Sequence, residues 1–242
     1  MKLLNHILLF LFKLGLSIKK PISGSYRTIS DYDYHYPWRG GEVDIPMQWF
    51  SDDNTIKEGN KFTILTKKEI KENWNYTNKV VDIYKFTSGL MYSKEKFMYG
   101  SFEADILIPE GYGLWSAFWL HGGLSNPRRF GEIDIFEYYG KEKKFTYNTH
   151  FGVDYDHNQS KGAHGIKIPK LENSWHKYRL DWFKGKNLRI YIDDKLVGIR
   201  SSEGTNLPMK LIFNMAIEEG IVNELDKFLP TKMLIKNIKY YD

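Results

Sequence analysis

Hydrophobic and polar residues alternate with a period of two through much of the chain after residue 20. In 102–108 and again in 188–193, apolar residues occupy every second position. Successive side chains of a strand point to opposite faces of a sheet, so this pattern predicts strands with one buried face. We expect strands at 61–68, 99–109, 131–140, 145–153, 176–183, 188–198, 209–217 and 233–242.

The predicted strands are short, rich in aromatic and β-branched residues, and separated by turn residues. A helical period is confined to the N-terminus. Many short strands at such spacing favour an antiparallel sandwich or barrel over βαβ units. We find no internal repeat or low-complexity linker, and 242 residues suit a single domain. We therefore expect one domain at 21–242 and a separate apolar segment at 1–20.

The N-terminal segment combines Lys2 with the apolar run ILLFLF, as an export signal does. Lys13 interrupts the run, and no A-x-A cleavage site follows. The run is too short to span a bilayer, and a buried helix is the alternative. Because the next residues, PISGS, are typical of a loop, we expect a cleaved signal and a secreted or cell-envelope protein.

Composition excludes several function classes. The net charge of +5 comes from scattered basic residues, so a nucleic-acid interface is not indicated. Cysteine is absent, which excludes disulfides and thiolate chemistry and leaves the compartment open. Aromatic residues make up 16% of the chain. Strands favour such rings, but rings also serve as flat platforms in binding clefts.

The stretch GEIDIFEYYG at 131–140 places three carboxylates on an apolar run. In a regular strand Glu132 and Asp134 share one face and Glu137 lies on the other. Either Glu137 is ordinary solvated decoration, or a β-bulge resets the alternation and the three acids converge. Crowded acids repel, so one carboxyl stays protonated near neutral pH while another is ionised. Glycosidic cleavage needs that division of labour.

Two tryptophans precede the acid strand in IPEGYGLWSAFWLHGG at 108–123. Trp115 and Trp119 are four residues apart, so a strand places both on one face. They are either core residues or the walls of a sugar site, because the apolar faces of pyranose rings stack on indole.

The same motifs, in order, resemble glycoside hydrolase family 16. The resemblance rests on TSGLMYSKEKFMYGSFEADILIPEGYGLWSAFWL, GEIDIFE, NTHFG, WHKYRLDWFKGKNLRIYIDDKLVG, LPMKLIFNMAI and IKNIKYYD. It runs from about Trp49 to the C-terminus. It implies a β-jelly-roll sandwich of two antiparallel sheets, with a substrate cleft on the concave face, and retaining hydrolysis of internal β-linkages.

The resemblance also implies roles for the acids. Glu132 matches the nucleophile, Glu137 the general acid/base, and Asp134 the carboxylate that assists the nucleophile. The E-x-D-x-x-E spacing is the bulged form, which is shared by laminarinase-like β-1,3-glucanases, agarases, porphyranases and carrageenases.

Further positions match substrate contacts of the family. Trp115 and Trp119 correspond to residues that line the central subsites, His150 to a cleft-facing histidine, and Asn214 to a cleft asparagine. Trp182 is either a further platform or a core residue. A solvated loop is the expected setting of Arg128 and Arg129, just before the acid strand.

Two departures from the family pattern stand out. Members of the family often bind a structural calcium through an Asp of the final strand, and this chain has Asn237 there. Because calcium prefers carboxylate ligands, the substitution weakens the case for a metal. Glu218 and Glu219 replace a glycine pair of the laminarinase-like branch, which changes one end of the cleft.

We therefore expect a monomeric, endo-acting β-glycanase that requires no cofactor. Its partner is a polysaccharide: a β-1,3- or mixed-linked glucan first, a sulphated galactan second. A transglycosylase and a non-catalytic polysaccharide-binding protein are the alternatives.

Overall fold

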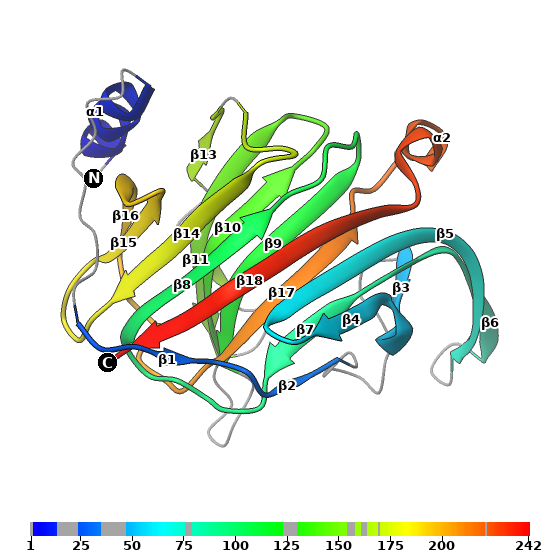
Figure 1. Cartoon of the computed structure of the whole chain (residues 1–242), viewed down its shortest axis with the longest axis horizontal. Helices are drawn as coiled ribbons and strands as arrows, with labels where there is room; N and C mark the ends of the chain where they lie inside the picture. Colours follow the sequence, from blue (N-terminus) through cyan, green and yellow to red (C-terminus); the bar gives the residue numbers. More distant parts are fainter. Residues whose placement is uncertain are drawn as a thin grey trace.

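Two sheets face each other in the computed structural model (Figure 1). The structure describes residues 2–13, 24–34, 47–75, 79–122, 130–153, 158–160, 164–168, 170–220 and 222–242. Within these residues, every pairing between strands is antiparallel except that of β3 (Gln48–Phe50) with β6 (Val80–Ser88). The all-β prediction of two antiparallel sheets is confirmed.

Among the described residues, ten strands form the first sheet. Its main path runs β16 (Lys195–Arg200), β15 (Leu188–Ile192), β14 (Trp175–Trp182), β8 (Gly100–Leu107), β18 (Thr231–Tyr241), β5 (Lys61–Asn75), β6 and β3. Two further strands pair at the side of this path: β1 (Arg27–Thr28) with β18, and β4 (Thr55–Glu58) with β5.

Eight described strands form the second sheet. Its order is β12 (Gln159–Ser160), β11 (Lys144–Gly152), β10 (Phe130–Tyr139), β9 (Leu114–Gly122), β17 (Lys210–Ile217), β7 (Leu90–Ser93) and β2 (Tyr32–Asp33), and β13 (His164–Ile166) pairs with β11. The helical elements of the described chain are α1 (Lys2–Lys13), α2 (Val222–Leu225) and the short 3-10 helices η2 (Asp52–Asn54) and η3 (Asp226–Phe228).

All eight segments predicted from alternation contain strands, and the segment 188–198 forms the hairpin of β15 and β16. The prediction missed β6, because its first half does not separate a buried from a solvated face. Val81 and Ile83 in β6 are exposed. Pairing with β5 along its length, which the local pattern does not report, makes this segment a strand.

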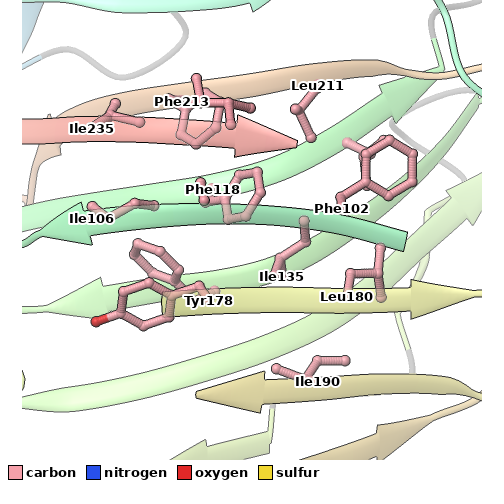
Figure 2. Close-up of a cluster of buried hydrophobic side chains, with 14 of the residues drawn as sticks. Phe102, Ile106, Phe118, Ile135, Tyr178, Leu180, Ile190, Leu211, Phe213 and Ile235 are labelled. Carbon is pink, nitrogen blue, oxygen red and sulfur yellow. The ribbon is translucent and has the colours of Figure 1, made fainter. Parts of the chain in front are cut away.

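The core lies between the two sheets and takes alternate residues from both (Figure 2). Phe102 and Ile106 of β8 enter it from the ten-stranded sheet, as the alternation at 102–108 predicts. Phe118 of β9 and Phe213 of β17 enter it from the eight-stranded sheet, where their rings stack 4.4 Å apart. Burial of these rings holds the two sheets face to face and leaves the outer face of each sheet for other chemistry.

Helix α1 lies beside the edge strand β16. Asn5 is buried, donates its side-chain N–H to the carbonyl of Ile199 and accepts the N–H of the same residue. Leu8 is buried as well, whereas Phe10 on the same helix is exposed. Part of the helix is therefore packed, as the buried-helix alternative requires, and cleavage of the segment stays a prediction. The described helices include none with the length and apolar character needed to cross a membrane.

Candidate active site

A β-bulge in β10 organises the candidate active site. Asp134 pairs with one residue of β9 and Phe136 pairs with the next, so Ile135 is an extra residue in the strand. Ile135 and Phe136 are both fully buried in the core between the sheets. The alternation is thereby reset, and Glu137 lies on the same outer face as Glu132. The predicted bulge between Asp134 and Glu137 is confirmed.

The cross-strand register brings candidate residues of three strands onto this outer face, because direct partners in an antiparallel pair share a face. Opposite the three acids in order, β11 carries His150, Asn148 and Thr146. Opposite the same acids, β9 carries His121, Trp119 and Ala117. Opposite those residues of β9, strand β17 carries Lys210, Ile212 and Asn214. We call this surface of the eight-stranded sheet the site face.

The three acids of the site face perturb one another. Burial and the charge of Glu137 raise the pKa of Glu132, while a hydrogen bond with Asp134 opposes the shift. Burial and the charges of Glu132 and Glu137 raise the pKa of Asp134 well above its ordinary value, against the field of Arg200. The acids are thus close enough to couple, and protons remain on this cluster at a pH where isolated carboxyls have lost them.

Glu137 has its own pair of hydroxyl donors. Tyr139 donates its O–H to Oε1 at 2.9 Å, and Thr146 donates to Oε2 at 3.2 Å. Burial raises the pKa of Glu137, and the two hydroxyl hydrogen bonds act against it. Burial therefore favours the protonated form of Glu137, and the two hydroxyl donors favour its ionised form.

His150 lies beside the other two acids. Its Nε2 is 3.5 Å from Oδ2 of Asp134 and 3.9 Å from Oε1 of Glu132. The same Nε2 is 2.8 Å from the amide nitrogen of Asn148, and Arg200 donates to the amide oxygen of Asn148 at 2.5 Å. The structure thus brings the predicted His150 to the acid cluster.

Trp115 and Trp119 are half-buried on the site face and pack on a small apolar cluster of their own. Its buried members are Phe50, Leu90, Tyr92, Ile212 and Ala216. Trp119 donates its indole N–H to Oδ1 of Asn214 at 2.8 Å, and Trp115 stacks on Tyr139 with ring centroids 5.1 Å apart. Asn214 thus fixes the edge of one indole and Tyr139 the face of the other, so both rings are rigid flat surfaces.

Trp182 does not belong to this site, and its prediction as a substrate platform is wrong. It lies at the end of β14 in the ten-stranded sheet and is fully buried in the core. Its ring packs on Tyr99 at 5.1 Å and on Phe102. The alternation of β14 turns Tyr178, Leu180 and Trp182 inward together, so Trp182 has a structural role.

Of the remaining positions, Arg128 and Arg129 lie outside the described residues. Glu218 directly follows β17, and its Oε1 accepts the backbone N–H of Lys141 at 3.1 Å. Burial raises the pKa of Glu218. This acid is thus partly enclosed at the end of the site face where the glycine pair is replaced.

Sequence reasoning missed Tyr139, Thr146, Asn148 and Arg200. A signal existed for the first three, since Tyr139 lies two positions after Glu137, and Asn148 and Thr146 lie two and four positions before His150. An even spacing along one strand places each on the face of a predicted residue. No local signal pointed to Arg200, because it enters from β16 of the other sheet.

Two groups of described residues contain atoms of the kinds that ligate metal ions. Among the described residues, the ligand atoms of Glu132, Asp134 and His150 lie within 4.8 Å of one another. Nε2 of His150 is already engaged by Asn148, so we do not assign these residues as metal ligands. On the ten-stranded sheet, Asn237 donates its amide N–H to Asp105 at 2.6 Å. Its side chain supplies a donor where calcium needs oxygen ligands, so these residues do not fit a calcium site of the expected kind.

Comparison with known proteins places this geometry among glycanases. The sequence profile of Glycosyl hydrolases family 16 matches residues 47–222. A "Glucan endo-1,3-beta-glucosidase" of Cryptopygus antarcticus is 33% identical over 119 residues, which cover 46% of this chain and 43% of that protein. The chain spans 43% of that relative, 38% of a "Beta-glucanase" of Rhodothermus marinus and 29% of a "Clotting factor G alpha subunit" of Tachypleus tridentatus.

Two solved structures are similar over most of the chain. A laminarinase from Flavobacterium sp. UMI-01 is 29% identical with a TM-score of 0.63, covering 81% of this chain and 84% of that one. The kappa-carrageenase of Pseudoalteromonas carrageenovora, solved with a kappa-carrageenan oligosaccharide, has a TM-score of 0.73 at 18% identity and covers 93% of this chain and 99% of that one. At that identity the likeness shows the fold alone. The predicted jelly-roll sandwich is confirmed.

Proposed function

Because this chain belongs to glycosyl hydrolases family 16, we propose that it is a retaining, endo-acting β-glycanase. The bulge in β10 carries the proposal, since it places Glu132, Asp134 and Glu137 on one face and couples their protonation. Retaining cleavage needs two nearby carboxyls, one ionised and one protonated. We infer that no cofactor is required, because acid, base and nucleophile are all side chains of β10.

The first chemical step joins the sugar to the protein. Glu137 transfers its proton to the glycosidic oxygen as the bond from that oxygen to the anomeric carbon breaks. A carboxylate oxygen of Glu132 forms the new bond to the anomeric carbon. Asp134, hydrogen-bonded to Glu132, supports the ionised form of the nucleophile before attack.

The second step releases the sugar. Glu137, now ionised, takes a proton from water while the water oxygen bonds to the anomeric carbon. Glu132 leaves with the electron pair of the ester bond, and two inversions give retained configuration. Trp115 and Trp119 serve as platforms for sugar rings on either side of the reacting bond, and His150 and Asn214 as polar contacts.

A β-1,3- or mixed-linked glucan is the proposed substrate class. The names of the Cryptopygus relative and of the Flavobacterium structure, at 33% and 29% identity, support this choice. A polymer of this kind lies outside the cell, which agrees with our proposal of a secreted or cell-envelope protein. We propose a monomer.

A sulphated galactan is the second candidate, and Lys210 favours it. This half-buried lysine lies on the site face in register with His121, with its ammonium 4.1 Å from the ring centroid of Tyr92. A cation in that position suits an anionic substituent on the polymer.

The test is a panel of laminarin, mixed-linked β-glucan, agarose and kappa-carrageenan, with NMR of the first product to read its anomeric configuration. We expect internal cleavage with retention, and a loss of at least about 10³-fold in Glu132→Gln. Glu103→Gln, which changes an acid of the other sheet, is the matched control and keeps its activity. Inverted product, or wild-type activity in Glu132→Gln, would overturn the mechanism. Longer products than the substrate would identify a transglycosylase, and binding without cleavage a polysaccharide-binding protein.

A further inference from the structure

A chain of polar side chains links the ten-stranded sheet to the acid cluster. Arg200, at the end of β16, is 3% exposed, and Asn148, on β11, is 4% exposed. Nη2 of Arg200 donates to Oδ1 of Asn148 at 2.5 Å, and Nδ2 of Asn148 lies 2.8 Å from Nε2 of His150. The last member, His150, is the residue beside Asp134 and Glu132.

Donor and acceptor chemistry determines where the protons of this chain lie. A guanidinium has only donors, so the atom of Asn148 facing Arg200 must be the amide oxygen. The NH₂ group of Asn148 then faces His150, and Nε2 must accept. A neutral imidazole that accepts at Nε2 carries its hydrogen on Nδ1. The amide nitrogen of Asn158 lies 3.1 Å from Nδ1 on the exposed side, and the Nδ1–H tautomer requires this amide to turn so that its oxygen accepts.

We propose that Arg200 is a positioning residue that, through Asn148, holds His150 as the neutral Nδ1–H tautomer beside the nucleophile. Its role in turnover rests on the proposed function, whereas its effect on the tautomer does not. Arg200 reaches the ring of His150 through the hydrogen bond to Asn148, and its charge also lowers the pKa of His150 and of Asp134.

The neutral tautomer matters because of the groups that face His150. These are the carboxylates of Glu132 and Asp134 from β10, the amides of Asn148 and Asn158, and the guanidinium of Arg200 from β16. An imidazolium here would ion-pair with the nucleophile and lower its reactivity. Burial and the charge of Arg200 lower the pKa of His150, against the hydrogen bond of Asn158, which agrees with a neutral ring.

The direct test reads the tautomer by long-range ¹H–¹⁵N NMR of the imidazole rings in the full chain, with His150 assigned by its loss in His150→Gln. We expect the Nδ1–H form at pH 7 in the wild type. Asn148→Asp replaces the NH₂ donor by a carboxylate oxygen, so Nε2 must become the donor and the ring changes to the Nε2–H form. Arg200→Met removes the donor that orients the Asn148 amide and the charge that lowers the pKa of His150, so the ring protonates at a higher pH. Arg200→Lys keeps a donor and a positive charge, and its His150 ring should behave as in the wild type.

The second readout is the acidic limb of the pH profile of kcat/KM on the polymer that the panel identifies. Protonation of His150 at higher pH moves this limb upward by about one pH unit in Asn148→Asp and in Arg200→Met. A wild-type ring in the Nε2–H or charged form, or an unchanged tautomer in Asn148→Asp, would overturn the proposal. A wild type inactive on every glycan, with the ring behaviour as stated, would overturn the proposed function and leave the role of Arg200 on the ring standing.

Discussion

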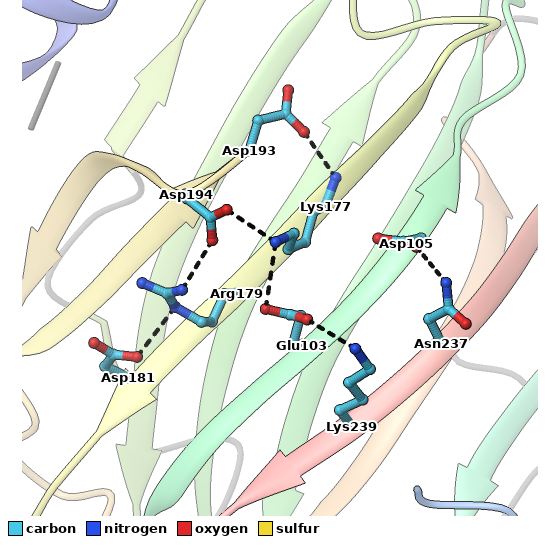
Figure 3. A network of polar contacts seen from close by, with 9 residues as sticks. All are labelled: Glu103, Asp105, Lys177, Arg179, Asp181, Asp193, Asp194, Asn237 and Lys239. Atoms are coloured by element: carbon cyan, nitrogen blue, oxygen red, sulfur yellow. Dashed lines mark hydrogen bonds and ion pairs between the residues drawn. The ribbon is translucent and has the colours of Figure 1, made fainter. Parts of the chain in front are cut away.

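Carboxylates on the outer faces of the two sheets have different partners. On the ten-stranded sheet, Glu103 is buried between Lys177 and Lys239, whose ammonium groups lie 3.9 and 3.8 Å from its oxygens (Figure 3). On the site face, Glu137 is bonded by the hydroxyls of Tyr139 and Thr146. The first acid faces cations and the second faces neutral donors.

The ion pairs of the ten-stranded sheet join three strands, β14, β8 and β18, and the turn after β15 (Figure 3). Lys177 also binds Asp194 at 2.9 Å, and Arg179 binds both Asp194 at 3.1 Å and Asp181 at 3.3 Å. We call these residues, with Glu103 and Lys239, the outer ladder. Its charges are paired within a network, so they stabilise one arrangement of the strands.

The difference separates a buried acid held in ion pairs from buried acids that lie next to like charges. Burial raises the pKa of Glu103, and the positive charges of Lys177, Lys239 and Arg179 reduce this shift. The acids of the site face have each other's charges instead, which add to the effect of burial. A buried acid next to a like charge is a candidate for proton transfer, and a buried acid in an ion-pair network is a structural residue.

The largest expected effect tests the site face. Glu137→Gln should lower kcat/KM on the polysaccharide by about 10³-fold, because no proton reaches the leaving oxygen. A dinitrophenyl glycoside of the released oligosaccharide needs no such proton, so its first step should be nearly unaffected, as a burst of dinitrophenol will show. Equal losses on both substrates would contradict the role of Glu137 as general acid.

The next effect tests the outer ladder. Arg179 is 1% exposed, and its guanidinium lies 4.0 Å from the ring centroid of Tyr191. Arg179→Met leaves two acids without their buried partner and should lower the free energy of unfolding by about 3–5 kcal/mol in urea titrations.

Lys68→Met is the control for the ladder, since it breaks the exposed ion pair with Asp226 and should cost less than about 1 kcal/mol. Folded Arg179→Met should keep the wild-type pH profile of activity. A shifted profile would mean that the two faces are not separate in function.

A smaller effect concerns the hydroxyl of Tyr139. Its hydrogen bond stabilises ionised Glu137, so Tyr139→Phe raises the pKa of that acid and should move the alkaline limb of kcat/KM upward by about one pH unit. The neighbouring Tyr138 is buried in the core on the other side of β10. Tyr138→Phe should leave the alkaline limb of kcat/KM unchanged. Equal shifts in both variants would contradict the role of the Tyr139 hydroxyl.

The smallest effect belongs to His176 and Asp193, which are joined at 2.8 Å. The hydrogen bond between them raises the pKa of His176 from 6.5. Burial raises the pKa of Asp193, but the same hydrogen bond lowers it, and the result lies below 3.8. The histidine contribution is complete below pH 6.5 and is lost as the pH rises through the raised pKa. The Asp193 contribution is present above pH 3.8 and is lost as the pH falls through the lowered pKa.

The pair should therefore stabilise the folded protein most between pH 3.8 and pH 6.5. His176→Gln should reduce the free energy of unfolding by less than about 1 kcal/mol at pH 5.5, and by a smaller amount at pH 8.5. An equal loss at both values would show that packing, and not charge, is responsible.

The sequence alone determined the fold class, because alternation with a period of two reports which residues must be buried. It also indicated the chemistry that we propose, because three acids on an apolar run are costly unless they share protons. The same parity left two alternatives for Glu137, a solvated position or a bulge that brings it to the other acids, and the strand register shows the bulge.

Only the tertiary structure decided what crosses between strands and sheets. Trp182 and Trp119 both lie on aromatic strands, and only the packing of two sheets shows that the first faces the core and the second the site. Arg200 reaches Asn148 from a strand about fifty positions away in the chain. Local pattern carries no information on such contacts, because they depend on how separate strands pair and pack.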